Sequence, residues 1–393
     1  MEPRLSYQIK KRYPEYITEI RNRAIALQEA GHHVLRLESG DIEVQSPPEI
    51  VAAITQAMQE GKTKYAHQCG IAPLRKKIQQ EIQETRDVPL SLDDICVTNG
   101  GTGALFTSFF MTLNERDEAI VPAPYWSVIA SQIRHLRAEL IEVPLTPTFD
   151  LDHEAIIKNL TSRTRAIYIN TPNNPTGALF SRQALEDVAE IAVSRNLWVV
   201  SDEAYDKIIF EGHHYSIFSM IPERTLLCGS FSKSLQSTGL RVGYVATANK
   251  EISSRFGDVA RSMTSGISTP TQYGLAQAQV SESSLQSFLQ TLQRKRDILV
   301  KGLSQVRGMY FQVPKAGLFI FVDCSEHIPP EVTGKERELY LANRLLDEGI
   351  AVCPGAAFGR NYSSYIRLAF STPTEQQLVE TGQRLQQIFG TKS

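Results

Sequence analysis

The sequence predicts an α/β protein in which helices cover both faces of a mostly parallel sheet, with a smaller α+β lobe after it. In the middle of the chain, short apolar runs such as residues 140–143 alternate with amphipathic stretches. Leu185, Val188, Ala189 and Ala192 follow the i, i+3, i+4, i+7 spacing of a helix with one buried face. Strands that alternate with such helices are typical of a parallel sheet.

The chain changes character from about Ser284 onward. A long helix-like stretch comes first, and residues 308–313 and 317–322 then have the apolar composition of strands. With 393 residues, the chain is long enough for two or three domains. We therefore expect the last hundred residues to form a lobe of their own.

Composition limits the classes of partner and compartment. The 41 Lys and Arg residues nearly balance the 43 Asp and Glu residues, so no overall field would attract nucleic acid or anionic lipid. No apolar run approaches the roughly 18 residues that span a bilayer, and the start, Met1-Glu2-Pro3-Arg4-Leu5, lacks the apolar core of a signal peptide. The five scattered cysteines form no Cys-x-x-Cys pair, which suits a reducing compartment. We predict a cytoplasmic protein.

Metal chemistry is not expected. The histidine pairs His32-His33 and His213-His214 have no metal-ligand spacing to carboxylates or thiols. We expect both pairs to lie at the surface.

A glycine-rich turn follows the first strong strand pattern. Residues 95–98 are apolar, and Asn99-Gly100-Gly101-Thr102-Gly103 then leads into a helix. Free backbone amides at a helix N-terminus bind phosphate well. The spacing matches neither the dinucleotide fingerprint nor the P-loop. Gly101 and Thr102 are therefore candidate contacts for an anion outside those two classes.

The next two strand patterns each end in a polar side chain. Residues 166–169 break at a turn from Asn170 to Gly177, in which Asn174 can donate to an anionic oxygen between two prolines. Residues 197–201 run into Asp202 at the strand edge where α/β proteins bind ligands. There Asp202 is placed to pair with a pyridinium nitrogen, and Tyr205 to bond a phenolic oxygen. The alternative reading of Asp202 is a helix N-cap or a surface acid.

Lys233 lies in Ser230-Phe231-Ser232-Lys233, eight residues before Arg241. A lysine whose pKa is lowered by burial and neighbouring cations can form a Schiff base with an aldehyde such as pyridoxal phosphate. The serines Ser230 and Ser232, with Arg241, would hold the phosphate. Alone, Ser-x-Ser-Lys also recurs by chance on solvated loops.

Taken in order, these segments resemble the class I/II aminotransferase family of fold type I pyridoxal phosphate enzymes, to which aspartate aminotransferases belong. The resemblance covers nearly the whole chain. The matching motifs are Lys64-Tyr65-Ala66 with Gly70, Gly100-Gly101-Thr102, Pro124-Tyr125-Trp126, Asn173-Asn174-Pro175-Thr176-Gly177, Ser201-Asp202-Glu203-Ala204-Tyr205, Ser230-Phe231-Ser232-Lys233, Arg241 and Tyr365-Ile366-Arg367-Leu368.

The resemblance implies a large domain with a mostly parallel seven-stranded sheet, a smaller α+β domain, and pyridoxal 5'-phosphate as cofactor. The resemblance divides the chain into three parts. Residues 1–45 would form an N-terminal arm and part of the small domain, residues 46–283 would form the large domain, and residues 284–393 would form the small domain. The activity it implies moves the amino group of an L-amino acid to a 2-oxo acid.

The resemblance also implies roles for individual residues. Lys233 would carry the Schiff base and move a proton, Trp126 would stack on the cofactor ring, and Arg367 would grip the substrate carboxylate. Gly40 would bring its backbone close to substrate. Tyr65 would reach the cofactor phosphate of a neighbouring subunit, which implies a homodimer with shared active sites. The cofactor residues are Gly101, Thr102, Trp126, Asn174, Asp202, Tyr205, Ser230, Ser232, Arg241 and Tyr65, and the substrate residues are Gly40, Asn174 and Arg367.

Two departures from the family pattern concern the substrate. Asp41-Ile42-Glu43-Val44 follows Gly40, where similar aminotransferases often have Glu-Pro-Asp-Phe. Some aspartate-specific bacterial members carry a lysine for the distal carboxylate where this chain has Thr102. Thr102 cannot supply that charge, so acidic, aromatic, neutral and basic amino donors all remain open.

Two other functions stay open on sequence alone. A lyase, synthase or oxidase of the same family would bind the cofactor through the same motifs. A regulatory or binding module on this fold is a different class. The presence of Lys233, and the lack of a winged-helix segment before residue 40, favour an enzyme.

Overall fold

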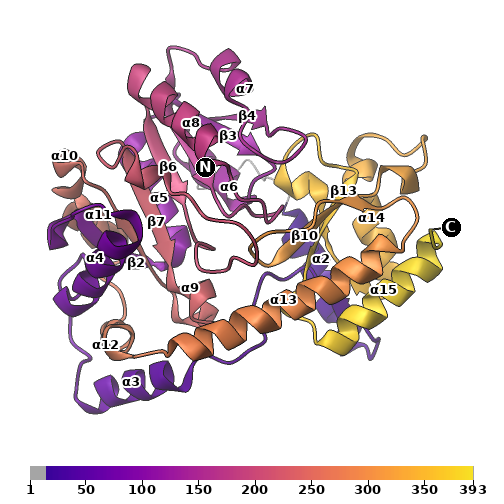
Figure 1. Ribbon diagram of the computed structural model, residues 1–393, viewed down its shortest axis with the longest axis horizontal. Coiled ribbons are helices and arrows are strands. Elements are labelled where there is room, and N and C mark those ends of the chain that lie inside the picture. Colours follow the sequence, from indigo (N-terminus) through magenta and orange to yellow (C-terminus); the bar gives the residue numbers. More distant parts are fainter. Residues whose placement is uncertain (1–14, 393) are drawn as a thin grey trace, which may run out of the picture.

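The computed structural model describes residues 15–392, so the Met1 to Leu5 segment lies outside the described part. Two lobes are joined by a long helix, α13 (Glu282–Ser304), which runs along one side of the molecule (Figure 1). Within residues 15–392, no helix is both long and apolar enough to cross a membrane.

The large lobe is built on a seven-stranded sheet, as the sequence predicted. The strand order is β2-β8-β7-β6-β5-β3-β4, and every neighbouring pair is parallel except the two that involve β8. Because β8 runs against the others, its first residue lies at the edge where the other strands end. The strands are β2 (Ile95–Asn99), β3 (Glu118–Ala123), β4 (Glu139–Pro144), β5 (Thr164–Asn170), β6 (Trp198–Asp202), β7 (Thr225–Ser230) and β8 (Val242–Ala246).

The central strands are apolar along their length because both faces of the sheet are buried. On β6, for example, Val199 packs under α8 (Arg182–Ser194), while Val200 faces α5 (Gly100–Thr112). The predicted helix at residues 185–192 is confirmed as part of α8. The other helices of this lobe are α3 (Pro48–Gln59), α4 (Ala72–Arg86), α6 (Val128–His135), α7 (His153–Lys158), α9 (Phe231–Ser234), α10 (Lys250–Ser253), α11 (Phe256–Met263) and α12 (Thr269–Gln277).

The small lobe holds an antiparallel sheet in the order β12-β13-β10-β9. It joins α13, α2 and two further helices in one hydrophobic core. Residues 308–313, predicted as a strand, form only the two-residue β9, whereas residues 317–322 largely coincide with β10. The elements are β9 (Tyr310–Phe311), β10 (Phe319–Asp323), β12 (Cys353–Pro354), β13 (Tyr365–Ala369), α14 (Gly334–Asp347) and α15 (Glu375–Phe389).

The N-terminal segment packs into this small lobe. Helix α2 (Tyr16–Glu29) buries Ile20 and Ala24 in its core, and β1 (Leu35–Arg36) pairs in parallel with β11 (Ile350–Ala351). In Figure 1, α2 lies beside β10, in the part of the molecule built mainly from the C-terminal quarter. The chain then returns to the large lobe. The boundaries at 45/46 and 283/284 stay predictions.

Helices α13 and α15 cross at a pair of glycines. A Cβ atom added to Gly302 would lie 2.9 Å from the Cα of Gly382, and one added to Gly382 would lie 2.8 Å from the Cα of Gly302. These distances are shorter than side-chain carbon atoms tolerate, so only glycine allows the two backbones to approach this closely. The contact anchors the long helix to the C-terminal helix.

Candidate active site

A cavity of about 390 Å³ lies between the two lobes, where the large sheet ends. Strands β5, β6 and β7 bring Asn170, Asp202 and Ser230 to this edge. Asn170 is in register with Asp202, and Ser230 lies two residues beyond the β7 partner of Asp202. Arg241, which immediately precedes the reversed strand β8, reaches the same edge. The small lobe closes the cavity with Phe319 and Arg367 on β10 and β13.

Twelve of the thirteen residues predicted for the site line this cavity. They are Gly40, Gly101, Thr102, Trp126, Asn174, Asp202, Tyr205, Ser230, Ser232, Lys233, Arg241 and Arg367. The thirteenth, Tyr65, lies outside it on the surface, with 95% of its area exposed. Nine further residues line the cavity without having been predicted. They are Ile17, Arg21, Ser39, Asp41, Leu105, Asn170, Ala204, Thr238 and Phe319.

Lys233 presents its amine inside the cavity. Its Nζ donates to the carbonyl oxygen of Gly40 at 2.5 Å. A side chain on Gly40 would collide with the ring of Phe319, 2.8 Å from the Cβ position, which explains the glycine there. Burial lowers the pKa of Lys233 to about 8. The charges of Arg367 and Arg241 also lower this pKa, and Asp41 opposes them.

Asp202 is a buried carboxylate at the end of β6. Burial raises its pKa to about 6, although two donors stabilise its charged form. The Tyr168 hydroxyl donates to its Oδ2 at 2.9 Å, and the Ala204 amide to its Oδ1 at 3.2 Å. Asp202 is thus mostly ionised at neutral pH and able to accept a hydrogen bond from a protonated nitrogen in the cavity.

The neighbouring acid, Glu203, turns away from the cavity into a buried ion-pair network. Its Oε2 lies 2.7 Å from Nη2 of Arg86 and 3.0 Å from Nε2 of His214. Burial alone would raise the pKa of Glu203, but Arg86 and His214 lower it to about 2. The surface position expected for His214 is therefore wrong, because the loop after β6 folds back over Glu203. His213, its neighbour, is exposed as expected.

Arg367 is 4% exposed, yet no carboxylate in residues 15–392 pairs with it. Its guanidinium donates to Asn174 Oδ1 at 3.1 Å, to the Glu38 carbonyl at 2.9 Å and to Cys353 Sγ at 3.1 Å. The Phe319 ring lies 4.1 Å from its Cζ. Its Nε has no partner within the described chain. A buried cation with a spare donor is a strong site for an incoming anion.

At the opposite side, Arg241 lies against the start of α5. A Cβ on Gly100 would be 2.4 Å from Nη2 of Arg241, and one on Gly101 would be 3.2 Å from the Cβ of Ser230. Arg241 Nη1 donates to Ser232 Oγ at 3.3 Å. A cation, two hydroxyls and the amides of a helix N-terminus thus surround one small volume, which suits a phosphate.

The cavity as a whole favours anions. Its lining contains four basic side chains, Arg21, Lys233, Arg241 and Arg367, against two carboxylates, Asp41 and Asp202. Because cationic groups lie at two sides of the cavity, it suits ligands that together carry more than one anionic group. Among residues 15–392, no cluster of three His, Cys, Asp or Glu side chains could hold a metal ion.

Comparison with known proteins gives a single family. The family model for aminotransferases of class I and II matches residues 32–385. The aspartate/prephenate aminotransferase of Thermus thermophilus is 31% identical over 395 residues, which cover 98% of this chain and 99% of that protein. The probable aspartate/prephenate aminotransferase of Aquifex aeolicus is 32% identical over 399 residues, covering 99% of each chain.

Solved structures agree with these relatives. The aspartate aminotransferase of Thermus thermophilus with maleate superimposes with a TM-score of 0.90 at 29% identity, over 98% of this chain and 100% of that one. The aspartate aminotransferase of Thermotoga maritima gives a TM-score of 0.89 at 28% identity, over 98% and 99% of the two chains.

The lowered pKa of Lys233 predicts unusual reactivity at moderate pH. Only the unprotonated amine attacks a carbonyl, so the reaction of Lys233 with an aldehyde should rise as pH increases through about 8 and level off above it. Labelling of the cofactor-free protein with formaldehyde and cyanoborohydride, read by peptide mass spectrometry, measures this profile. Surface Lys158 provides the internal reference. A Lys233 profile that coincides with the Lys158 profile would show that burial does not activate the amine.

Proposed function

The chain belongs to the class I and II aminotransferase family, and from this premise we propose that it moves the amino group of an L-amino acid to a 2-oxo acid with Lys233 as the reacting amine. The observation that carries this proposal is the convergence of Lys233, Asp202 and Arg367 on one cavity. A nucleophilic amine, a buried acid and an unpaired buried guanidinium are the groups that this reaction needs.

Aminotransferases of this family use pyridoxal 5'-phosphate, which draws electrons from a bound amino acid into its ring and so makes the Cα proton acidic. The cavity residues fit this group. Arg241, Ser230, Ser232 and the N-terminus of α5 would hold the phosphate. Asp202 would accept a hydrogen bond from the ring nitrogen and keep that nitrogen protonated.

The remaining cofactor contacts fix the ring in its plane. Trp126, partly buried against the core of the large lobe, would pack on one face of the ring. Tyr205 and Asn174 would donate to the phenolic oxygen. Burial raises the pKa of Tyr205 above its ordinary value, although Arg367 and a hydrogen bond with Asn174 oppose this, so the hydroxyl keeps the proton that it donates.

The substrate residues then orient the amino acid and move its proton. Arg367 would bind the α-carboxylate with two parallel N–H donors, using the Nε that has no partner within the described chain. This contact would aim the Cα–H bond at Lys233, whose amine would take the proton from Cα and return it to the cofactor. The amino donor leaves as a 2-oxo acid, and a second 2-oxo acid takes up the amino group by the reverse steps.

Two finer proposals concern assembly and compartment. Tyr65 is supported as a contact to a second subunit by its exposure, and α3 nearby exposes Val51 and Met58. We propose a homodimer in which Tyr65 reaches the neighbouring cofactor phosphate. The five cysteines are all unpaired, which supports a cytoplasmic location.

Transamination is tested by single-turnover reaction of the purified holoenzyme with a panel of amino acids. We expect the cofactor absorbance to change once, with one 2-oxo acid formed per cofactor and no ammonia. Mass spectrometry identifies the product and hence the donor. Release of ammonia with recovery of the original absorbance would instead identify a lyase or an oxidase.

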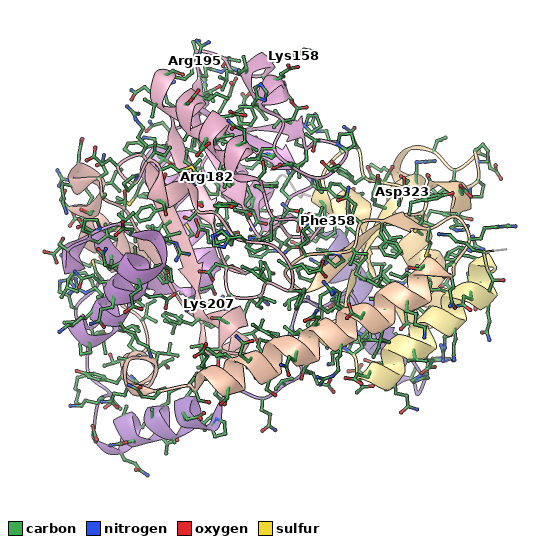
Figure 2. All side chains as sticks on the ribbon, viewed as in Figure 1. Lys158, Arg182, Arg195, Lys207, Asp323 and Phe358 are labelled. Atoms are coloured by element: carbon green, nitrogen blue, oxygen red, sulfur yellow. The ribbon has the colours of Figure 1, made fainter. Side chains whose placement is uncertain are left out.

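Replacement of Arg367 tests the carboxylate contact. Arg367→Ala should raise KM for amino acids of every side-chain class, and lower kcat/KM about 10- to 100-fold, because a hydrogen-bonded charge pair is lost. Arg195→Ala provides the matched control, since Arg195 lies at the outer edge of the large lobe (Figure 2). A defect confined to one class of side chain would place Arg367 elsewhere in the reaction.

Mixing of two inactive variants tests the shared site. Tyr65→Ala removes the contact to the neighbouring site, and Lys233→Ala removes the amine. A hybrid dimer of the two contains one site with native Lys233 and native Tyr65. Refolding the variants together should therefore restore about a quarter of wild-type activity, since half of the dimers are hybrids with one intact site each. No recovery despite hybrids detected by native mass spectrometry would show that Tyr65 does not act across the dimer.

A further inference from the structure

We infer that Arg21 forms a third anion-binding point in the cavity, so that the preferred substrates carry a second acidic group on their side chain. This inference deepens the proposed function and rests on it. Arg21 would supply the positive charge that Thr102 cannot, and it lies on a helix outside the motifs that match the family.

Arg21 is an exposed arginine of the cavity lining that is unpaired within the described residues. It lines the cavity together with Ile17, one helical turn before it on α2. It forms no hydrogen bond or ion pair within residues 15–392. Its neighbours at i±3 and i±4 are Ile17, Thr18, Ala24 and Ile25, none of which is acidic, so the helix offers no intrahelical ion pair.

Arg21 lies on the same side of the cavity as Arg367. Helix α2 packs against β12, which carries Cys353. Burial raises the pKa of the Cys353 thiol, and Arg367 and Arg21 both oppose this, which places both positive charges near the same sulfur. Arg367 Nη2 donates to that sulfur at 3.1 Å. The buried Arg367 contacts Cys353, and the exposed Arg21 lies close enough for its charge to act on the same thiol.

The charges in the cavity leave Arg21 free for the substrate. Under the proposed function, Arg241 faces the phosphate and Arg367 the α-carboxylate, while Lys233 reacts. Among the described lining residues, Arg21 is then the one basic side chain that meets no anionic group of the cofactor or of a neutral amino acid. A carboxylate on the substrate side chain would supply the missing anion.

Asp41, the other charged group near the mouth, is already engaged. Its Oδ1 accepts from the Thr238 hydroxyl at 2.6 Å and from the Ile42 amide at 2.9 Å. Its charge also acts on Lys233. A basic substrate would therefore compete with existing contacts of Asp41, whereas an acidic one would meet an unoccupied guanidinium.

The test compares substrates that differ by one charge. We measure kcat/KM of the holoenzyme for aspartate against asparagine and for glutamate against glutamine. Wild type should prefer the acid of each pair. In Arg21→Gln, the ratio of acid to amide should fall by about tenfold or more, the usual loss when the charged partner of a carboxylate is removed. Arg21→Lys should retain part of the ratio.

Arg23→Gln provides the control on the same helix. Arg23 contacts Asn343 and Asp347 on α14 and does not line the cavity, so this variant should keep the wild-type ratio. A binding measurement complements the kinetics. Calorimetry of succinate and butyrate with the holoenzyme compares two acids that differ by one carboxylate, and Arg21→Gln should lose the preference for succinate.

The possible failures are distinct. Wild type that converts these amino acids, with equal ratios in Arg21→Gln and wild type, would overturn the inference and leave the proposed function intact. A preference of wild type for lysine over norleucine that disappears in Asp41→Asn would overturn it as well, in favour of basic donors. Wild type that forms no 2-oxo acid from any donor would contradict the proposed function itself.

Discussion

The alignment of β5, β6 and β7 determines where the polar groups of the cavity lie. Both faces of each strand are buried, so a polar side chain can face the cavity only where the strand ends. Asn170 pairs in register with Asp202, and Ser230 ends the next strand. Parallel strands end at the same edge, and the reversed β8 adds Arg241 there from its beginning. A shift of one strand by one residue would turn its functional side chain into the core.

The reactivity of the cavity depends on charged side chains that have few partners of opposite charge. Asp202 and Arg367 are buried and Lys233 is partly so, and such burial disfavours the charged state of each. Asp202 receives two hydrogen bonds and Lys233 has the Gly40 carbonyl, while Arg367 has only neutral partners among residues 15–392. By contrast, Glu203 is fully paired with Arg86 and His214. The paired acid stabilises the fold, and the incompletely paired groups beside it remain available to ligands.

Sequence alone predicted those parts of the site that depend on local structure. Asp202 and Lys233 follow strands that their own neighbours specify, so the fold and the membership of the cavity could be anticipated. Arg21 could not, because α2 reaches the cavity only through packing in the small lobe, far from the residues that it joins in sequence. The partnership of His214 with Glu203 was hidden for the same reason, since it depends on a returning loop. The role of Tyr65 involves a second subunit, and the contacts between subunits cannot be derived from the sequence of one chain.

The crossing of α13 and α15 has a consequence for how this protein diverges among its relatives. Glycine lowers helix stability by about 1 kcal/mol relative to alanine at an interior position, and this chain accepts that cost in two facing helices. Gly302 and Gly382 each occupy the space that the other's methyl group would need. A lineage that gains alanine at one position must therefore separate the two helices and repack the leucines around them. The two positions should therefore covary among relatives, and relatives that keep both glycines should also keep the same distance between these two helices.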